Sequence, residues 1–111
     1  YETTFRVVTE AIDRYPRLRG IYMANLSVSG CAAAIEQAGK KGAIRLICHD
    51  LNESVRQLLL RGSIDFTIPQ NLRQQGYGPL ILLRDVLRRK AAPDAARFNR
   101  QIDIVCSDNL P

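Results

Sequence analysis

The residues best suited to chemistry in this 111-residue sequence are polar side chains that follow short apolar runs. They are Asn25, His49, Asp50, Gln70 and Asn71. Amide side chains both donate and accept hydrogen bonds, whereas an ionised carboxylate only accepts them. A carboxylate that accepts from two neighbouring hydroxyls, flanked by amides, would fix the orientation of a sugar or polyol. We therefore predict a ligand-binding set, although polar residues at such positions also commonly cap helices.

His49 is the single histidine of the sequence, and its place beside Asp50 raises a catalytic or metal-binding interpretation. Neighbouring residues of a strand point to opposite faces, so the two side chains do not aim at one point if the strand continues. The sequence also lacks a G-x-S-x-G nucleophile elbow, a G-x-G-x-x-G loop and a P-loop. We therefore expect no enzymatic activity, no metal site and no nucleotide cofactor.

Helical and strand patterns alternate along the chain and would position these side chains. Phe5, Val8 and Ile12 recur at helical spacing, with Thr3 or Thr4 as the cap and Pro16 as the stop. The pattern predicts helices over 3–15, 29–39, 52–62 and a stretch ending at 90, strands over 21–24, 43–48, 64–68 and 102–106, and a polar loop over 91–100.

This alternating order predicts an α/β fold with a mostly parallel sheet and helices on both faces, in three layers. Right-handed crossovers would bring the carboxyl ends of the first three strands to one edge of the sheet. Open α/β sheets bind their ligands at that edge. We therefore expect Asn25, Asp50 and Gln70 to meet there.

Composition narrows the class of protein. Sixteen Lys and Arg against eleven Asp and Glu give a net charge of +5, and the basic residues are scattered along the chain. That distribution argues against a DNA-binding face within these residues, and the apolar runs are far shorter than the ~18 residues that cross a membrane. Cys31, Cys48 and Cys106 lack metal-site or disulfide spacing. They lie within apolar stretches, and buried unpaired thiols favour a reducing compartment, so we predict a cytoplasmic protein.

Three segments carry a resemblance to a known family. Residues 20–25, 47–52 and 62–71 resemble the C-terminal lobe of type I periplasmic-binding-protein domains, and the closing residues 108–111 resemble the tail of Lac-repressor type (LacI/GalR) transcriptional regulators. The resemblance covers nearly the whole chain. It implies a Rossmann-like half of a two-lobed fold that holds a sugar between its lobes.

The resemblance also assigns site residues. Asp50 and Gln70 are similar to the ligand-contacting acid and amide of the family. Asn25 stands one residue too close to Gly30 for the usual pattern, which leaves Ser27 and Ser29 as substitutes. The segment His49-Asp50-Leu51-Asn52 resembles a subgroup of this family in which the corresponding loop has the sequence His-Asp/Glu-Leu-Thr.

We accordingly interpret residues 1–111 as the C-terminal lobe of the effector-binding part of a DNA-binding regulator, acting as a homodimer and not attached to a membrane. A sugar or polyol effector would alter operator affinity, and the N-terminal lobe and helix-turn-helix would lie outside this chain. The alternative is the solute-binding component of a sugar ABC transporter, which needs an export signal. Tyr1 is not a start methionine and residues 1–6 lack the apolar core of a secretory signal, so we expect the upstream sequence to decide.

Overall fold

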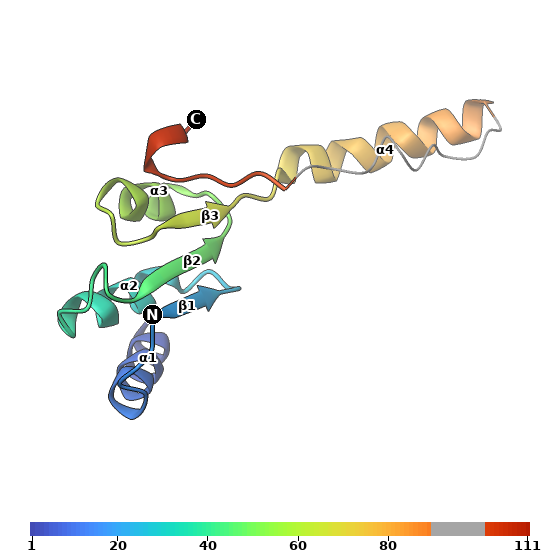
Figure 1. The fold of residues 1–111 in the computed structure, drawn as a ribbon. Helices are drawn as coiled ribbons and strands as arrows, with labels where there is room; N and C mark the ends of the chain where they lie inside the picture. The colour runs from blue at the N-terminus through green and yellow to red at the C-terminus, as the bar shows by residue number, and fades with distance from the viewer. Residues whose placement is uncertain (90–101) are drawn as a thin grey trace. The chain divides into compact units, whose positions relative to one another are not determined.

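The computed structural model describes residues 1–89 and 102–111 (Figure 1). The chain divides into two compact units, one formed by Tyr1–Pro69 with Ile104–Pro111 and the other by Gln70–Asp103. The polar loop expected over 91–100 lies outside the described residues.

Among the described residues, the first unit contains three helices, three strands and a short 3-10 helix, and the second contains one long helix. The elements are α1 (Glu2–Arg14), β1 (Gly20–Met23), α2 (Val28–Gln37), β2 (Arg45–His49), α3 (Glu53–Leu60), β3 (Phe66–Ile68), α4 (Leu72–Arg89) and η2 (Ser107–Asn109). No helix among the described residues is long and apolar enough to span a membrane.

The three strands form a parallel sheet in the order β1-β2-β3, and their arrowheads point the same way (Figure 1). Met23 pairs with Cys48, which in turn pairs with Thr67. Because the strand order follows the sequence, right-handed crossovers place α2 and α3 on the same face of the sheet. The α/β class with a parallel sheet is confirmed.

One face of the sheet forms the core of the first unit. Leu46 and Cys48 of β2 and Thr67 of β3 are fully buried, and they pack with apolar residues of α1, α2 and α3. On the opposite face Tyr22 is 55% exposed, and Ile47 beside it is half-buried. In the first unit the helices thus bury one face, and helical cover of the second face stays a prediction.

In both crossovers of the sheet, through α2 and α3, the helix ends at a glycine that follows it, and in α3 a side chain also caps the start. Asn52 caps α3, because its Oδ1 accepts a hydrogen bond from the Val55 amide at 2.9 Å. Gly39 and Gly62 follow α2 and α3 with φ of 65° and 67°, a backbone conformation that glycine adopts without strain. The ends expected for the helices over 29–39 and 52–62 agree with these positions.

The starts of α1 and α2 differ from the sequence expectation. The N-cap of α1 is Tyr1 rather than Thr3 or Thr4, and α2 begins at Val28, so Ser29 lies inside the helix. The first turn of α1 packs closely on α2 at Gly30, where a Cβ atom would lie 2.6 Å from the Tyr1 carbonyl oxygen. Tertiary packing therefore decides where these helices begin.

The expected strand over 102–106 is wrong. Val105 forms only an isolated antiparallel bridge, exchanging two backbone hydrogen bonds of 2.8 and 2.9 Å with Thr67. The helix expected to end at Lys90 is α4, which begins at Leu72 and keeps Pro79 inside it. Apolar alternation at Ile102 and Ile104 resembles a strand, but both side chains are exposed and little packing holds them in a sheet.

Candidate functional site

The strand register brings Asn25 and Asp50 to the same edge of the sheet. Met23 pairs with Cys48, and Asn25 and Asp50 each follow two residues later. Since parallel neighbours end on the same side, both residues lie beyond the carboxyl ends of their strands. This edge is the place where α/β sheets hold ligands.

Asp50 combines a left-handed backbone with an unengaged carboxylate. Its φ is 68°, the one positive value of a non-glycine residue within the described part of the chain. That conformation costs about 1 kcal/mol for most residues with a side chain, and aspartate is among those that tolerate it best. Within residues 1–89 and 102–111, the Asp50 carboxylate makes no hydrogen bond or ion pair. Its oxygens are therefore available to accept hydrogen bonds from a ligand.

Strand β3 holds the backbone of Asp50 on both sides. The Asp50 amide donates to the Ile68 carbonyl at 3.0 Å. The Thr67 hydroxyl donates to the Asp50 carbonyl at 2.6 Å and lies 3.2 Å from the Cys48 carbonyl. The sequence does not indicate this role of Thr67, because the role depends on the pairing of β2 with β3, which the spacing of residues does not reveal.

Asn25 helps to start the next helix. Its Oδ1 accepts a hydrogen bond from the Ser27 amide at 3.0 Å, and Ser27 is the N-cap of α2. This contact is an Asx turn, in which a polar side chain after a strand satisfies the loop backbone before the helix. The exposed side-chain amide nitrogen of Asn25 can still donate to a ligand.

His49 packs against Tyr22 of the neighbouring strand. The Tyr22 hydroxyl and His49 Nε2 form a hydrogen bond, and the two rings meet edge to face with centroids 5.4 Å apart. His49 Nδ1 is buried and has no hydrogen-bond partner among the described residues. Tyr22 was missed at the level of sequence, because only the register of β1 on β2 brings it beside His49. A ligand role for His49 stays a prediction.

Gln70 and Asn71 belong to the second unit and lead into α4. The Gln70 carbonyl accepts a hydrogen bond from the Leu72 amide, and the Asn71 carbonyl accepts one from the Gln75 amide, both at 2.8 Å. The Gln70 side chain is exposed. The expected meeting of Gln70 and Asn71 with Asp50 stays a prediction.

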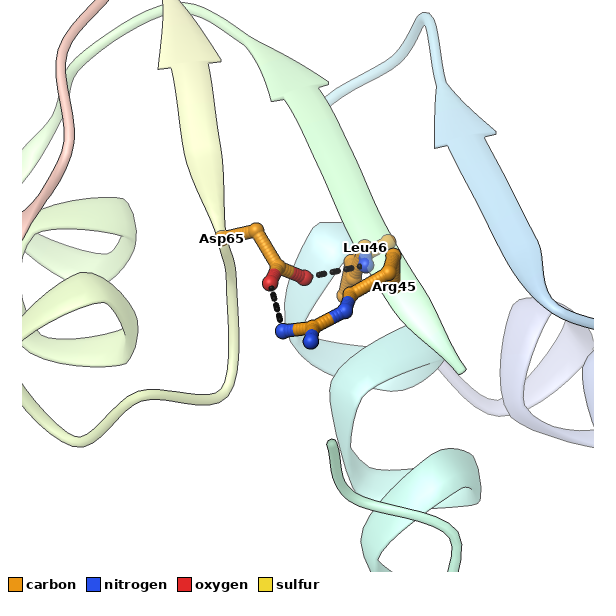
Figure 2. Close-up of polar contacts among 3 residues, drawn as sticks. All are labelled: Arg45, Leu46 and Asp65. Atoms are coloured by element: carbon orange, nitrogen blue, oxygen red, sulfur yellow. Dashed lines mark hydrogen bonds and ion pairs between the residues drawn. The ribbon is translucent and has the colours of Figure 1, made fainter. Parts of the chain in front are cut away.

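The opposite end of the same strand pair holds a second aspartate. Figure 2 shows that the Asp65 carboxylate accepts hydrogen bonds from the Arg45 guanidinium at 2.7 Å and from the Leu46 amide at 2.8 Å. The Asp65 amide in turn donates to the Leu46 carbonyl at 2.9 Å. Both carboxylate oxygens are thus engaged within the fold, which indicates a structural role for Asp65.

Two of the three cysteines are part of the core. Burial raises the pKa of the Cys31 thiol to about 11. Burial also raises the pKa of Cys48, against the opposing effect of its hydrogen bond with Thr67 and with a smaller contribution from the nearby Asp50 charge. Both side chains are fully buried. They therefore carry their protons at neutral pH and pack as small apolar groups.

Comparison with known proteins identifies the family. Residues 1–91 match the family described as periplasmic binding protein domain. The chain is 31% identical over 80 residues to the D-allose-binding periplasmic protein of Escherichia coli (strain K12), and this match covers 71% of the chain and 26% of that protein.

Solved structures of sugar-binding proteins share the fold. GanP, a glucose-galactose binding protein from Geobacillus stearothermophilus, matches 97% of this chain with a TM-score of 0.82 and 19% identity. The sugar-binding protein of a sugar ABC transporter from Bacillus halodurans matches 96% of it with a TM-score of 0.79 and 23% identity. The chain covers 38% and 40% of these two proteins.

The prediction of a cytoplasmic protein is wrong. The curated relative is a periplasmic protein, and the structural relatives are a glucose-galactose binding protein and the sugar-binding protein of a sugar ABC transporter. The free thiols do not indicate the compartment, because Cys31 and Cys48 are packed in the core, where a thiol persists unpaired whatever the redox conditions outside.

The names of these relatives refer to sugar binding and not to catalysis or transcription. They agree with the resemblance to type I periplasmic-binding-protein domains and do not extend to its regulator part. With a family match over residues 1–91 and a parallel α/β unit, the chain belongs to the periplasmic binding protein domain family.

Proposed function

We propose that this chain is one lobe of a sugar-binding protein that serves an ABC transporter, and that it binds a sugar or polyol at the carboxyl edge of its sheet. The observation that carries the proposal is the Asp50 carboxylate, which no described residue engages and which stands at the edge where such sheets bind ligands. Relatives that bind allose, glucose and galactose support a sugar as the ligand.

The chemistry of the edge suits a hydroxylated ligand. An ionised carboxylate accepts two hydrogen bonds from adjacent hydroxyl groups, and such charge-assisted bonds are stronger than bonds between neutral groups. The amide of Asn25 would add a donor on one side of the ligand. Asp50 would therefore set the orientation of the sugar, and Asn25 would select among its hydroxyls.

A second lobe would complete the site. The chain covers 26% of its curated relative, so contacts to the other side of the sugar would come from residues outside this chain. A ligand shifts the balance between open and closed lobes only through its different affinity for the two states. Contacts made on both sides of the sugar in the closed state provide that difference.

Calorimetric titration of the full-length protein with D-allose, D-galactose, D-glucose and L-arabinose tests the proposal. We expect saturable binding of at least one of these sugars. The isolated residues 1–111 should show no measurable affinity for the same sugar, because half of its contacts would be missing. Absence of binding by the full-length protein would contradict sugar binding, and tight binding by the isolated chain would contradict a site shared between lobes.

A second candidate is the effector-sensing part of a DNA-binding regulator, favoured by the resemblance of residues 108–111 to the Lac-repressor type tail. It uses the same sugar site and differs in its partners, which would be operator DNA and a second copy of the protein. The sequence upstream of Tyr1 separates the two candidates. An export leader supports the transporter component, and a helix-turn-helix supports the regulator.

A further inference from the structure

Thr67 is a buried polar residue of β3, the strand that pairs with β2 in the sheet. Its side chain is fully buried, and its Oγ1 lies within hydrogen-bond distance of three groups of β2 and the residue after it. A threonine hydroxyl has one proton to donate. The 2.6 Å contact with the Asp50 carbonyl is shorter than the 3.2 Å contact with the Cys48 carbonyl. The Thr67 hydroxyl therefore donates its proton mainly to the Asp50 carbonyl oxygen.

This hydrogen bond reaches the strained residue of the proposed sugar site. Asp50 has a left-handed backbone, which persists only when the surrounding structure fixes it. The Ile68 carbonyl holds the Asp50 amide, and the Thr67 hydroxyl holds the Asp50 carbonyl. Both contacts come from β3, so two successive residues of that strand hold the backbone at Asp50.

We propose that Thr67 is a positioning residue of the sugar site, whose buried hydroxyl holds the left-handed backbone of Asp50 and thereby sets where the carboxylate is presented. This inference rests on the proposed function. Thr67 itself is sealed in the core and does not touch the ligand. It acts on the sugar only through Asp50.

Cys48 orients the threonine hydroxyl. Its Sγ donates to Thr67 Oγ1 at 3.4 Å, which leaves the threonine proton to point toward a carbonyl. Because burial raises the pKa of Cys48, the thiol keeps the proton that this donation needs. Cys48, Thr67 and the Asp50 carbonyl thus form a short chain of hydrogen bonds from the core to the edge of the sheet.

Two substitutions at Thr67 separate positioning from packing. Thr67→Val keeps the shape of the side chain and removes the hydroxyl, whereas Thr67→Ser keeps the hydroxyl and removes a methyl group. If the hydroxyl positions Asp50, the full-length Thr67→Val protein binds its preferred sugar from the panel at least tenfold more weakly than wild type. Thr67→Ser then stays within threefold of wild type, although it is the variant that leaves a cavity.

The matched control is Thr9→Val. Thr9 also donates its hydroxyl to a backbone carbonyl, that of Phe5 at 2.8 Å, but it lies in α1. We expect this variant to bind sugar with wild-type affinity. Circular dichroism and thermal unfolding, measured on all three variants, establish that each is folded at the temperature of the titration.

If Thr67→Val does not fold, Cys48→Ala takes its place. Removal of the thiol donor should weaken sugar binding at least threefold, whereas Cys31→Ala leaves a cavity of the same kind in the same core and should leave affinity unchanged. Equal affinities of these two variants would overturn the proposal. So would a Thr67→Ser protein that binds more weakly than Thr67→Val, because packing would then be the role of Thr67.

Asp50→Asn distinguishes failure of this inference from failure of the proposed function. Asparagine tolerates the left-handed backbone and removes the charge. If the wild type binds no sugar of the panel, or Asp50→Asn binds as wild type does, both the sugar site and the positioning role are overturned. If Asp50→Asn weakens binding more than tenfold and Thr67→Val does not, only the positioning role is overturned.

Discussion

Asp65 and Asp50 stand at opposite ends of the same pair of strands, and the fold uses their carboxylates differently. At the amino-terminal end, both oxygens of Asp65 accept hydrogen bonds from β2 (Figure 2). At the carboxyl-terminal end, β3 holds the backbone of Asp50 through the Ile68 carbonyl and the Thr67 hydroxyl. The Asp50 carboxylate itself is engaged by no described residue.

The difference separates a carboxylate that serves the fold from one that is kept for a ligand. Asp65 stabilises the entry of β2 into the sheet by satisfying the Leu46 amide. Asp50 has a left-handed backbone conformation, which does not stabilise the fold. Its carboxylate makes no hydrogen bond or ion pair with the described residues of the first unit. Strain of this kind is expected where function requires it, so affinity should depend on one aspartate and stability on the other.

The largest expected effect is the loss of sugar affinity in Asp50→Ala. Loss of two hydrogen bonds to a charged group, at about 1.5 kcal/mol each, corresponds to an affinity roughly 100-fold lower. Calorimetric titration of the full-length variant with the sugar that wild type prefers measures it. Asp65→Ala serves as the control and should bind within threefold of wild type. An unchanged affinity in Asp50→Ala would contradict the separate roles of Asp50 in ligand binding and Asp65 in stability.

The reciprocal effect is a loss of stability in Asp65→Ala. Without the carboxylate the Leu46 amide loses its partner, which should lower the free energy of unfolding by about 2 kcal/mol. Arg45→Gln removes only the exposed ion pair with Asp65 and keeps the hydrogen bond from the Leu46 amide. It should lower the free energy of unfolding by less than about 0.5 kcal/mol. Urea unfolding measures both. Equal losses would mean that the ion pair, rather than the backbone contact, stabilises this end.

The core beneath both ends should respond to high pH. The pKa of Cys31 is 9.0 when unfolded and about 11 in the folded protein, so between these values the folded state holds more protons. Stability should therefore fall as pH rises from 9 to 11, by about 2 kcal/mol at most. Urea unfolding of wild type and Cys31→Ala at pH 8 and pH 11 isolates this contribution. A difference between the two proteins that does not change with pH would contradict it.

The smallest expected effect concerns the backbone of Asp50 alone. Glycine adopts a φ of 68° freely, whereas alanine does not, so Asp50→Gly should be more stable than Asp50→Ala by about 1 kcal/mol. At a position with ordinary strand or helix geometry, the alanine variant is the more stable of the two. Thermal or urea unfolding of the pair gives the answer. A more stable alanine variant would show that no left-handed strain is held at this position.

Much of the fold was predictable, because local chemistry and periodicity agree with it. The Asn52 cap, the glycine stops at 39 and 62 and the three parallel strands all follow from residue types that have few alternatives in these positions. The starts of α1 and α2 and the missing last strand were not predictable, because close packing at Gly30 and weak packing around Ile102 decide them.

For the site, the sequence predicts only which polar residues follow the apolar strands. Asp50 stands out because a polar residue follows an apolar strand. The left-handed backbone, the Thr67 contact and the Tyr22–His49 contact depend on which residues face one another across the sheet. Sequence spacing along one strand does not contain that register. For the same reason Asp65, whose carboxylate reaches across to β2, was not singled out.

A crystal structure of the full-length protein with its preferred sugar tests the central claim most directly. The account predicts two sugar hydroxyls within about 2.5–3.0 Å of the Asp50 carboxylate oxygens, with the left-handed backbone at that residue retained. A sugar bound away from the carboxyl edge of the sheet, or an Asp50 side chain turned from it, would contradict the account.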